Sequence, residues 1–82
     1  MSVAQVLLFG RLADLAGWRE RQAPAAATLA ELKAALAALD PALGEALAGP
    51  GVLATVDKAV VRGDIALTPG AEVAFMPPMS GG

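Results

Sequence analysis

The residues that could take part in covalent chemistry are the last six: Pro77, Pro78, Met79, Ser80, Gly81 and Gly82. Gly81 and Gly82 have no side chains, so they can enter a channel that is too narrow for any Cβ atom. Adenylation of the terminal carboxylate by a partner would make its carbon open to attack by sulfur or by an amine. Six extended residues reach about 20 Å, and the two prolines stiffen the base of the segment. We therefore expect an extended tail that offers a carboxyl group to a partner.

The other residue types exclude several classes of function. The chain has no cysteine and no histidine, so it lacks a thiol nucleophile, an imidazole base and Cys/His zinc ligands. Its eight acidic residues are scattered, and we expect no metal site, no catalytic side chain and no bound cofactor. The net charge of −2 and the six dispersed basic residues argue against nucleic-acid binding. No uncharged stretch is long enough to span a bilayer and no secretory signal is apparent, so we expect a cytoplasmic protein without membrane partners.

Hydrophobic spacing predicts the elements that position this tail. Residues 3–9 form an apolar run that ends at Gly10. Such a run is typical of a strand that is central in a sheet or covered on both sides. Residues 11–16 predict a short helix capped by Gly17, and residues 18–22 predict an edge strand.

Thr28 and Glu31 form a capping box for a longer helix. Its apolar stripe is Leu29, Leu32, Leu36 and Leu39. Asp40 and Pro41 start a further helix, which ends at Gly49, Pro50 and Gly51.

The second half of the chain predicts mainly strands. These are residues 52–56, 60–62 and 72–76, with a possible turn at Asp57 and Lys58 and turn signals around residues 63–64 and 69–70. One sheet packed on one main helix is the economical arrangement for a single amphipathic stripe. The sequence therefore predicts an α+β fold of the ubiquitin-like β-grasp type, with a mixed sheet. Residues 1–76 would form the domain and residues 77–82 the tail.

Two features have a second interpretation. A glycine tail is also common as an idle chain end, although here it follows directly on a predicted strand and two prolines. Phe75, Met76, Pro77 and Met79 form an apolar group at the root of the tail. Such a group is either part of the core or a docking surface, because methionine beside an aromatic residue suits both.

The chain resembles the small, sulfur-carrying subunit of molybdopterin synthase, within the MoaD/ThiS-like β-grasp family. The resemblance covers essentially the whole chain and is carried by residues 9–17, 53–57 and, most specifically, 67–82. The chain departs from residues that are frequent in the family at four positions: Ala71, Asp57, Ala13 and Asp14. These are turn and surface positions, so the departures affect contacts with particular partners rather than the chemistry of the tail.

The resemblance implies a mechanism and a set of partners. A ubiquitin-activating-like adenylyltransferase would use ATP to adenylate the C-terminal glycine, which is then converted to a thiocarboxylate. The tail would enter the large catalytic subunit of molybdopterin synthase, a heterotetramer, and donate sulfur to a pyranopterin precursor. By position, Gly82 would carry the adenylate and then the sulfur, and Gly81 would give access to the channel. The residues implied in partner binding are Phe75, Met76, Pro77, Pro78, Met79 and Ser80.

Three alternatives stay open. A sulfur carrier for thiamine thiazole synthesis uses the same chemistry, but such carriers are usually shorter and lack the two prolines. A protein modifier that forms isopeptide bonds with lysines also begins from an acyl-adenylate. The third alternative is an interaction module with an idle tail. In the first two, as in the main interpretation, the chain is a cosubstrate of its partners.

Overall fold

A computed structural model describes residues 4–23 and 26–78. In this part of the chain the strands are β1 (Ala4–Leu8), β2 (Glu20–Ala23), β3 (Leu53–Val56), β4 (Ala59–Val61) and β5 (Glu72–Met76). The helices are α1 (Arg11–Ala16), α2 (Leu29–Leu39) and α3 (Pro41–Leu47). The strands form one sheet in the order β2-β1-β5-β3-β4. Only the β1–β5 pair is parallel, so the sheet is mixed, as predicted.

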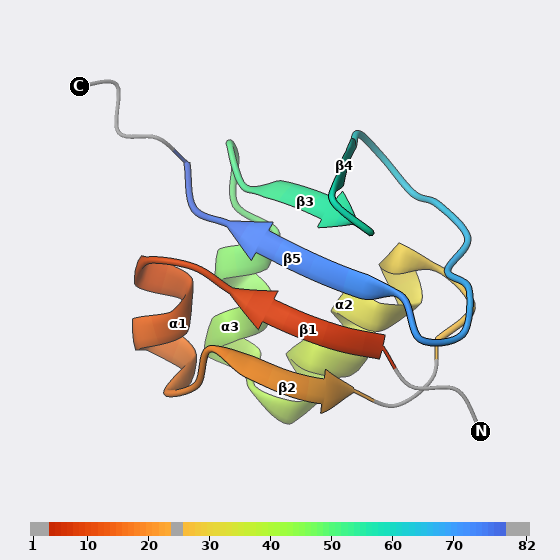
Figure 1. The fold of residues 1–82 in the computed structure, drawn as a ribbon. Helices are drawn as coiled ribbons and strands as arrows, with labels where there is room; N and C mark the ends of the chain where they lie inside the picture. The colour runs from red at the N-terminus through yellow and green to blue at the C-terminus, as the bar shows by residue number, and fades with distance from the viewer. Residues whose placement is uncertain (1–3, 24–25, 79–82) are drawn as a thin grey trace.

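Within the described residues, α2 and α3 lie on one face of this sheet, and α1 lies beside the end of β1 and the start of β2, so no helix covers the other face (Figure 1). In β1, Ala4, Val6 and Leu8 are buried while Gln5 and Leu7 are half-buried. This alternation shows that one face of β1 is covered, and its neighbours β2 and β5 make it an interior strand. Of the two alternatives for this segment, the strand inside the sheet is correct. None of the helices in the described residues has the length and apolar character needed to cross a membrane.

The start of α2 is held by bonds from both near and distant residues. The Thr28 Oγ1 accepts a hydrogen bond from the Glu31 N–H at 3.2 Å, which confirms the predicted cap. The Ala30 N–H donates to Asp64 Oδ1 at 2.8 Å, across 34 positions of sequence. The Leu29 N–H donates to the Ile65 carbonyl oxygen at 2.9 Å. The N–H groups that a helix leaves unpaired in its first turn therefore fasten the segment after β4 to α2.

The predicted stripe of α2 is wrong at its last member. Leu29, Leu32 and Leu36 are buried, but Leu39 is 62% exposed. Leu39 lies in the final turn, beside a shallow groove that Trp18 and Arg21 also line. Helical spacing determines the side of a helix on which a residue lies, but not how far along the axis other elements cover it.

The remaining differences concern the ends of strands. β2 begins at Glu20, two residues later than predicted, and pairs with β1 alone, which confirms it as an edge strand. Between β4 and β5, Ala66 makes an isolated bridge to Thr28. Asp57 and Lys58 both have positive φ, at 49° and 73°, and connect β3 to β4 in the predicted two-residue turn.

Candidate functional site

The strand that leads into the tail is paired with a neighbouring strand on each side. β5 lies between β1 and β3, and Phe75 pairs with Leu8 on one side and Ala54 on the other. The Phe9 N–H also donates to the Phe75 carbonyl oxygen at 3.2 Å. The first residues of the tail therefore follow a strand that is paired on both sides.

The apolar group at the root of the tail divides between core and surface. The Phe75 side chain is 0% exposed, so it belongs to the core and supports the root from inside. Met76 and Pro77 are half-buried and Pro78 is exposed. Among the residues predicted to bind partners, these three therefore present accessible side chains. Met79, Ser80, Gly81 and Gly82 lie outside the described residues.

Two glycines pack against the prolines that begin the tail. Gly10 follows β1 and Gly51 precedes β3, and their φ angles are +56° and +83°. A Cβ atom on Gly10 would lie 3.0 Å from Pro77 Cγ, and one on Gly51 would lie 2.8 Å from Pro78 Cβ. Sequence reasoning missed these contacts, because it assigned Gly10 to the end of a strand and Gly51 to the end of a helix.

A groove of about 460 Å³ lies beside the same prolines. Leu12, Leu15 and Val52 contribute apolar walls, and Arg11 and Asp14 contribute charged ones. Pro77 and Pro78 form another wall. The root of the tail is thus packed against the two glycines and open toward the groove.

The uncovered face of the sheet is apolar near the tail. The register of the strands places one row of side chains across this face. Leu7 pairs with Ala74, and Thr55 pairs with both Ala74 and Val60. A parallel row joins Leu53 to Met76. Val60 is 56% exposed and Leu53 40%. We call the larger apolar side chains of these two rows the outer patch: Leu7, Leu53, Val60 and Met76.

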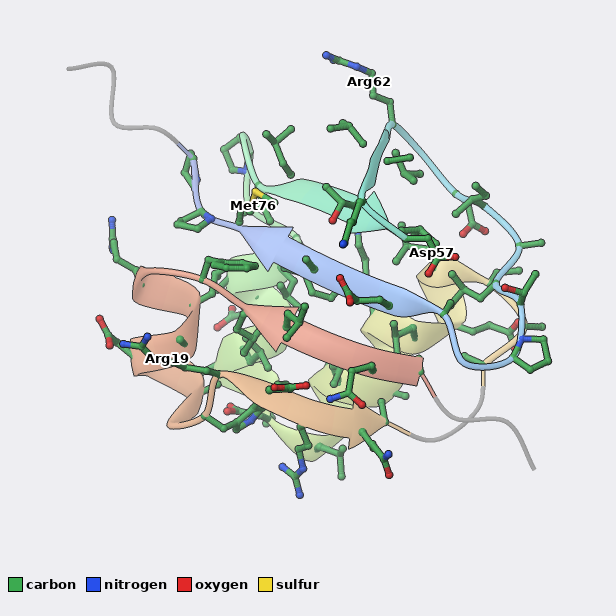
Figure 2. All side chains as sticks on the ribbon, viewed as in Figure 1. Arg19, Asp57, Arg62 and Met76 are labelled. Atoms are coloured by element: carbon green, nitrogen blue, oxygen red, sulfur yellow. The ribbon has the colours of Figure 1, made fainter. Side chains whose placement is uncertain are left out.

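The outer patch adjoins the exit of the tail. Figure 2 shows Met76 at the carboxyl end of β5, beside the start of β3, with Arg62 pointing away from the body at the edge of the sheet. Within residues 4–23 and 26–78, no group of three or more acidic side chains is placed to hold a metal ion. The described part of the site therefore offers contact surface beside the residues that begin the tail.

Comparison with known families identifies the class. The model of the ThiS family matches residues 6–82, nearly the whole chain. The chain belongs to the ThiS family. The matched residues include Gly81 and Gly82. The predicted MoaD/ThiS-like family is thereby confirmed, and this ThiS-family chain is of the ubiquitin-like sulfur-carrier and modifier class.

Solved structures confirm the β-grasp fold. The crystal structure of SAMP1 from Haloferax volcanii is 26% identical with a TM-score of 0.86, over 98% of this chain and 99% of that one. A crystal structure of H. volcanii small archaeal modifier protein 1 is 24% identical with a TM-score of 0.86, over 96% of this chain and 100% of that one. A search of the curated proteins found no match.

Proposed function

We propose that this ThiS-family protein carries sulfur as a thiocarboxylate on Gly82 and supplies it for the synthesis of molybdopterin. The observation that carries the proposal is the family match through Gly81 and Gly82, on a fold whose held strand β5 leads straight into Pro77 and Pro78. A carrier without cysteine has no thiol of its own, so the sulfur has to be held on a carboxyl carbon.

The proposed reaction begins on a partner. An oxygen of the Gly82 carboxylate attacks the α-phosphorus of ATP in an adenylyltransferase, and pyrophosphate leaves. Hydrosulfide, at the oxidation level of sulfide, attacks the acyl carbon, AMP leaves, the S–H proton is lost to solvent, and a thiocarboxylate remains. In the large synthase subunit the thiocarboxylate sulfur displaces an oxygen leaving group from a carbon of the pyranopterin precursor. Water then cleaves the acyl–sulfur bond, which restores the carboxylate and leaves the sulfur on the precursor. This chain supplies the carrier group, and its partners supply ATP and catalytic side chains.

The outer patch supports the proposal that this protein docks on partner proteins. Leu53, Val60 and Met76 present apolar surface beside the exit of the tail, and apolar side chains at the centre of an interface account for much of its stability. We propose that the adenylyltransferase and the large synthase subunit both dock there, the latter in a heterotetramer.

A protein modifier is the second candidate. It is favoured by the similarity to SAMP1, a small archaeal modifier protein, over nearly the full length of both chains. In this reaction a lysine amine of a target protein attacks the Gly82 acyl carbon and forms an isopeptide bond. A sulfur carrier for thiamine synthesis would share the thiocarboxylate, and Pro77 and Pro78 favour the molybdopterin carrier over it.

The intact mass of the protein distinguishes these functions. We expect co-expression with an adenylyltransferase and a sulfur donor to add about 16 Da, the replacement of one oxygen by sulfur. The gain should disappear when Gly82 is deleted. Adducts on target lysines without the mass gain would favour the modifier. If deletion of Gly82 leaves molybdoenzyme activity in the host unchanged, the molybdopterin role is wrong.

Gly81→Ala tests whether the tail works in a narrow channel. We expect an unchanged free energy of unfolding but about a hundredfold slower sulfur transfer, because a Cβ atom would displace the reacting carbon. Gly63→Ala is the control for a Cβ atom away from the tail, where it meets nothing within 4 Å. Because the φ of Gly63 is +97°, the rates are compared at equal folded fraction. Single-turnover transfer from purified thiocarboxylate provides the measurement. Equal rates for Gly81→Ala and wild type would contradict the steric role of Gly81.

A further inference from the structure

We propose that Gly10 and Gly51 are positioning residues, which set the direction in which the chain leaves β5. We call the contacts of Gly10 with Pro77 and of Gly51 with Pro78 the exit clamp. Its effect on activation rests on the proposed function, whereas its effect on the direction of the tail does not.

The topology of the sheet brings the two glycines together. β1 runs parallel to β5, so Gly10, just beyond β1, lies at the carboxyl end of β5. β3 runs antiparallel, so Gly51, just before β3, lies at the same end. Since β1 and β3 flank β5 on opposite sides, the two loops approach the root of the tail from opposite edges (Figure 1).

The contacts at both positions require glycine. The positive φ angles of Gly10 and Gly51 lie in the region that residues with a Cβ atom rarely occupy. The space is also filled: a Cβ atom on Gly51 would lie 2.8 Å from Pro78 Cβ and 3.7 Å from Pro78 Cα. Pro78 cannot yield by rotating its side chain, because its ring is closed onto the backbone. A side chain at position 51 would therefore shift the backbone of the tail.

A fixed direction favours delivery of the carboxyl group. Proline restricts φ to about −65°, so two prolines held in place define where the following residues begin. Ordering that occurs before binding reduces the entropy lost when the tail enters a partner. The groove beside both prolines leaves room for them to move, so we expect a substitution in the exit clamp to redirect the tail while the domain stays folded.

The glycines of this chain provide a matched pair of variants. Gly17 and Gly51 share a φ of +83°, but a Cβ atom on Gly17 meets nothing within 4 Å. Gly17→Ala therefore carries the backbone strain of Gly51→Ala without the collision. Pro78→Gly removes the ring from the opposite side of the contact and adds no bulk, so it tests the exit clamp without straining position 51.

Nuclear magnetic resonance on the full chain measures the direction of the tail. Because the chain has no cysteine, Arg62→Cys and Glu45→Cys each give one site for a nitroxide label. Both residues are exposed, and Arg62 lies just after β4 while Glu45 lies on α3. We compare the paramagnetic relaxation of the Gly81 and Gly82 amides from each label. Gly51→Ala and Pro78→Gly should change the ratio of the two rates by more than Gly17→Ala does.

Activation is measured separately, by ATP–pyrophosphate exchange with the adenylyltransferase that modifies the wild type. We expect kcat/KM to fall about tenfold for Gly51→Ala relative to Gly17→Ala, through misplacement of the reacting carboxylate. Urea unfolding confirms that each variant is folded. Unchanged relaxation ratios in both folded variants would overturn the exit clamp, and changed ratios with unchanged kcat/KM would overturn its role in activation. If wild type is never activated, the proposed function fails, and the relaxation ratios still decide whether the exit clamp exists.

Discussion

Phe75→Ala should lower the free energy of unfolding by about 3–5 kcal/mol, the usual cost of removing a fully enclosed phenylalanine. The side chain is 0% exposed and belongs to the central strand of the sheet, so little could collapse into the space it leaves. A domain of this size has a total stability of about 4–12 kcal/mol. The variant should therefore be substantially unfolded under conditions in which the wild type is folded.

Urea unfolding followed by circular dichroism provides the measurement, and Phe9→Ala is the control. Phe9 is the other phenylalanine and is 47% exposed, so we expect it to lose less than half as much stability. If Phe75 acts only from the core, its variant should lose activation in proportion to its unfolded fraction. A folded Phe75→Ala protein that fails to be activated would instead show a direct role in partner binding.

Local patterns predicted most of the helices and strands. Thr28, Asp40 and Gly17 each act within one helical turn of their position in the sequence, so the signal and the structure it produces lie in the same short segment. The predicted limits of the last strand, residues 72–76, also agree with β5. Its apolar residues are followed directly by two prolines, which cannot continue a ladder.

Contacts between distant segments were not predictable in the same way. Asp64 satisfies the N–H of Ala30 across 34 positions, and no local spacing indicates that pairing. Gly10 and Gly51 were predicted only as ends of elements, because their second role depends on where β5 delivers Pro77 and Pro78. A glycine that ends an element and one that makes room for another segment have the same local signature.

For the proposed site, the sequence predicts a reactive end but not the surface that we propose selects partners. Gly81 and Gly82 follow from residue type, and the family match extends through both. Carriers and modifiers begin from the same acyl-adenylate, so the tail does not distinguish them. The outer patch joins residues from four strands, and it exists only once β1, β5, β3 and β4 lie side by side. Discrimination between partners is therefore expected to reside in these residues.

Leu53→Glu tests that expectation with the largest effect on binding. Leu53 is 40% exposed and pairs with Met76 at the exit of the tail, so a carboxylate there would be desolvated beneath any docked partner. We expect the KM for adenylation to rise about tenfold to a hundredfold, the range for a central interface residue. The free energy of unfolding should change by only about 1 kcal/mol, as at other accessible positions.

Leu39→Glu is the control that separates docking on the outer patch from a general loss of apolar surface. Leu39 is more exposed than Leu53, at 62%, but it lies on α2, on the opposite side of the sheet (Figure 1). General loss of apolar surface would affect both variants alike, whereas docking on the outer patch raises KM for Leu53→Glu alone. Equal KM values for the two variants would show that partners approach the tail from another side. The groove lined by Arg11, Leu15 and Pro78 would then be the next surface to test, because it adjoins the same exit.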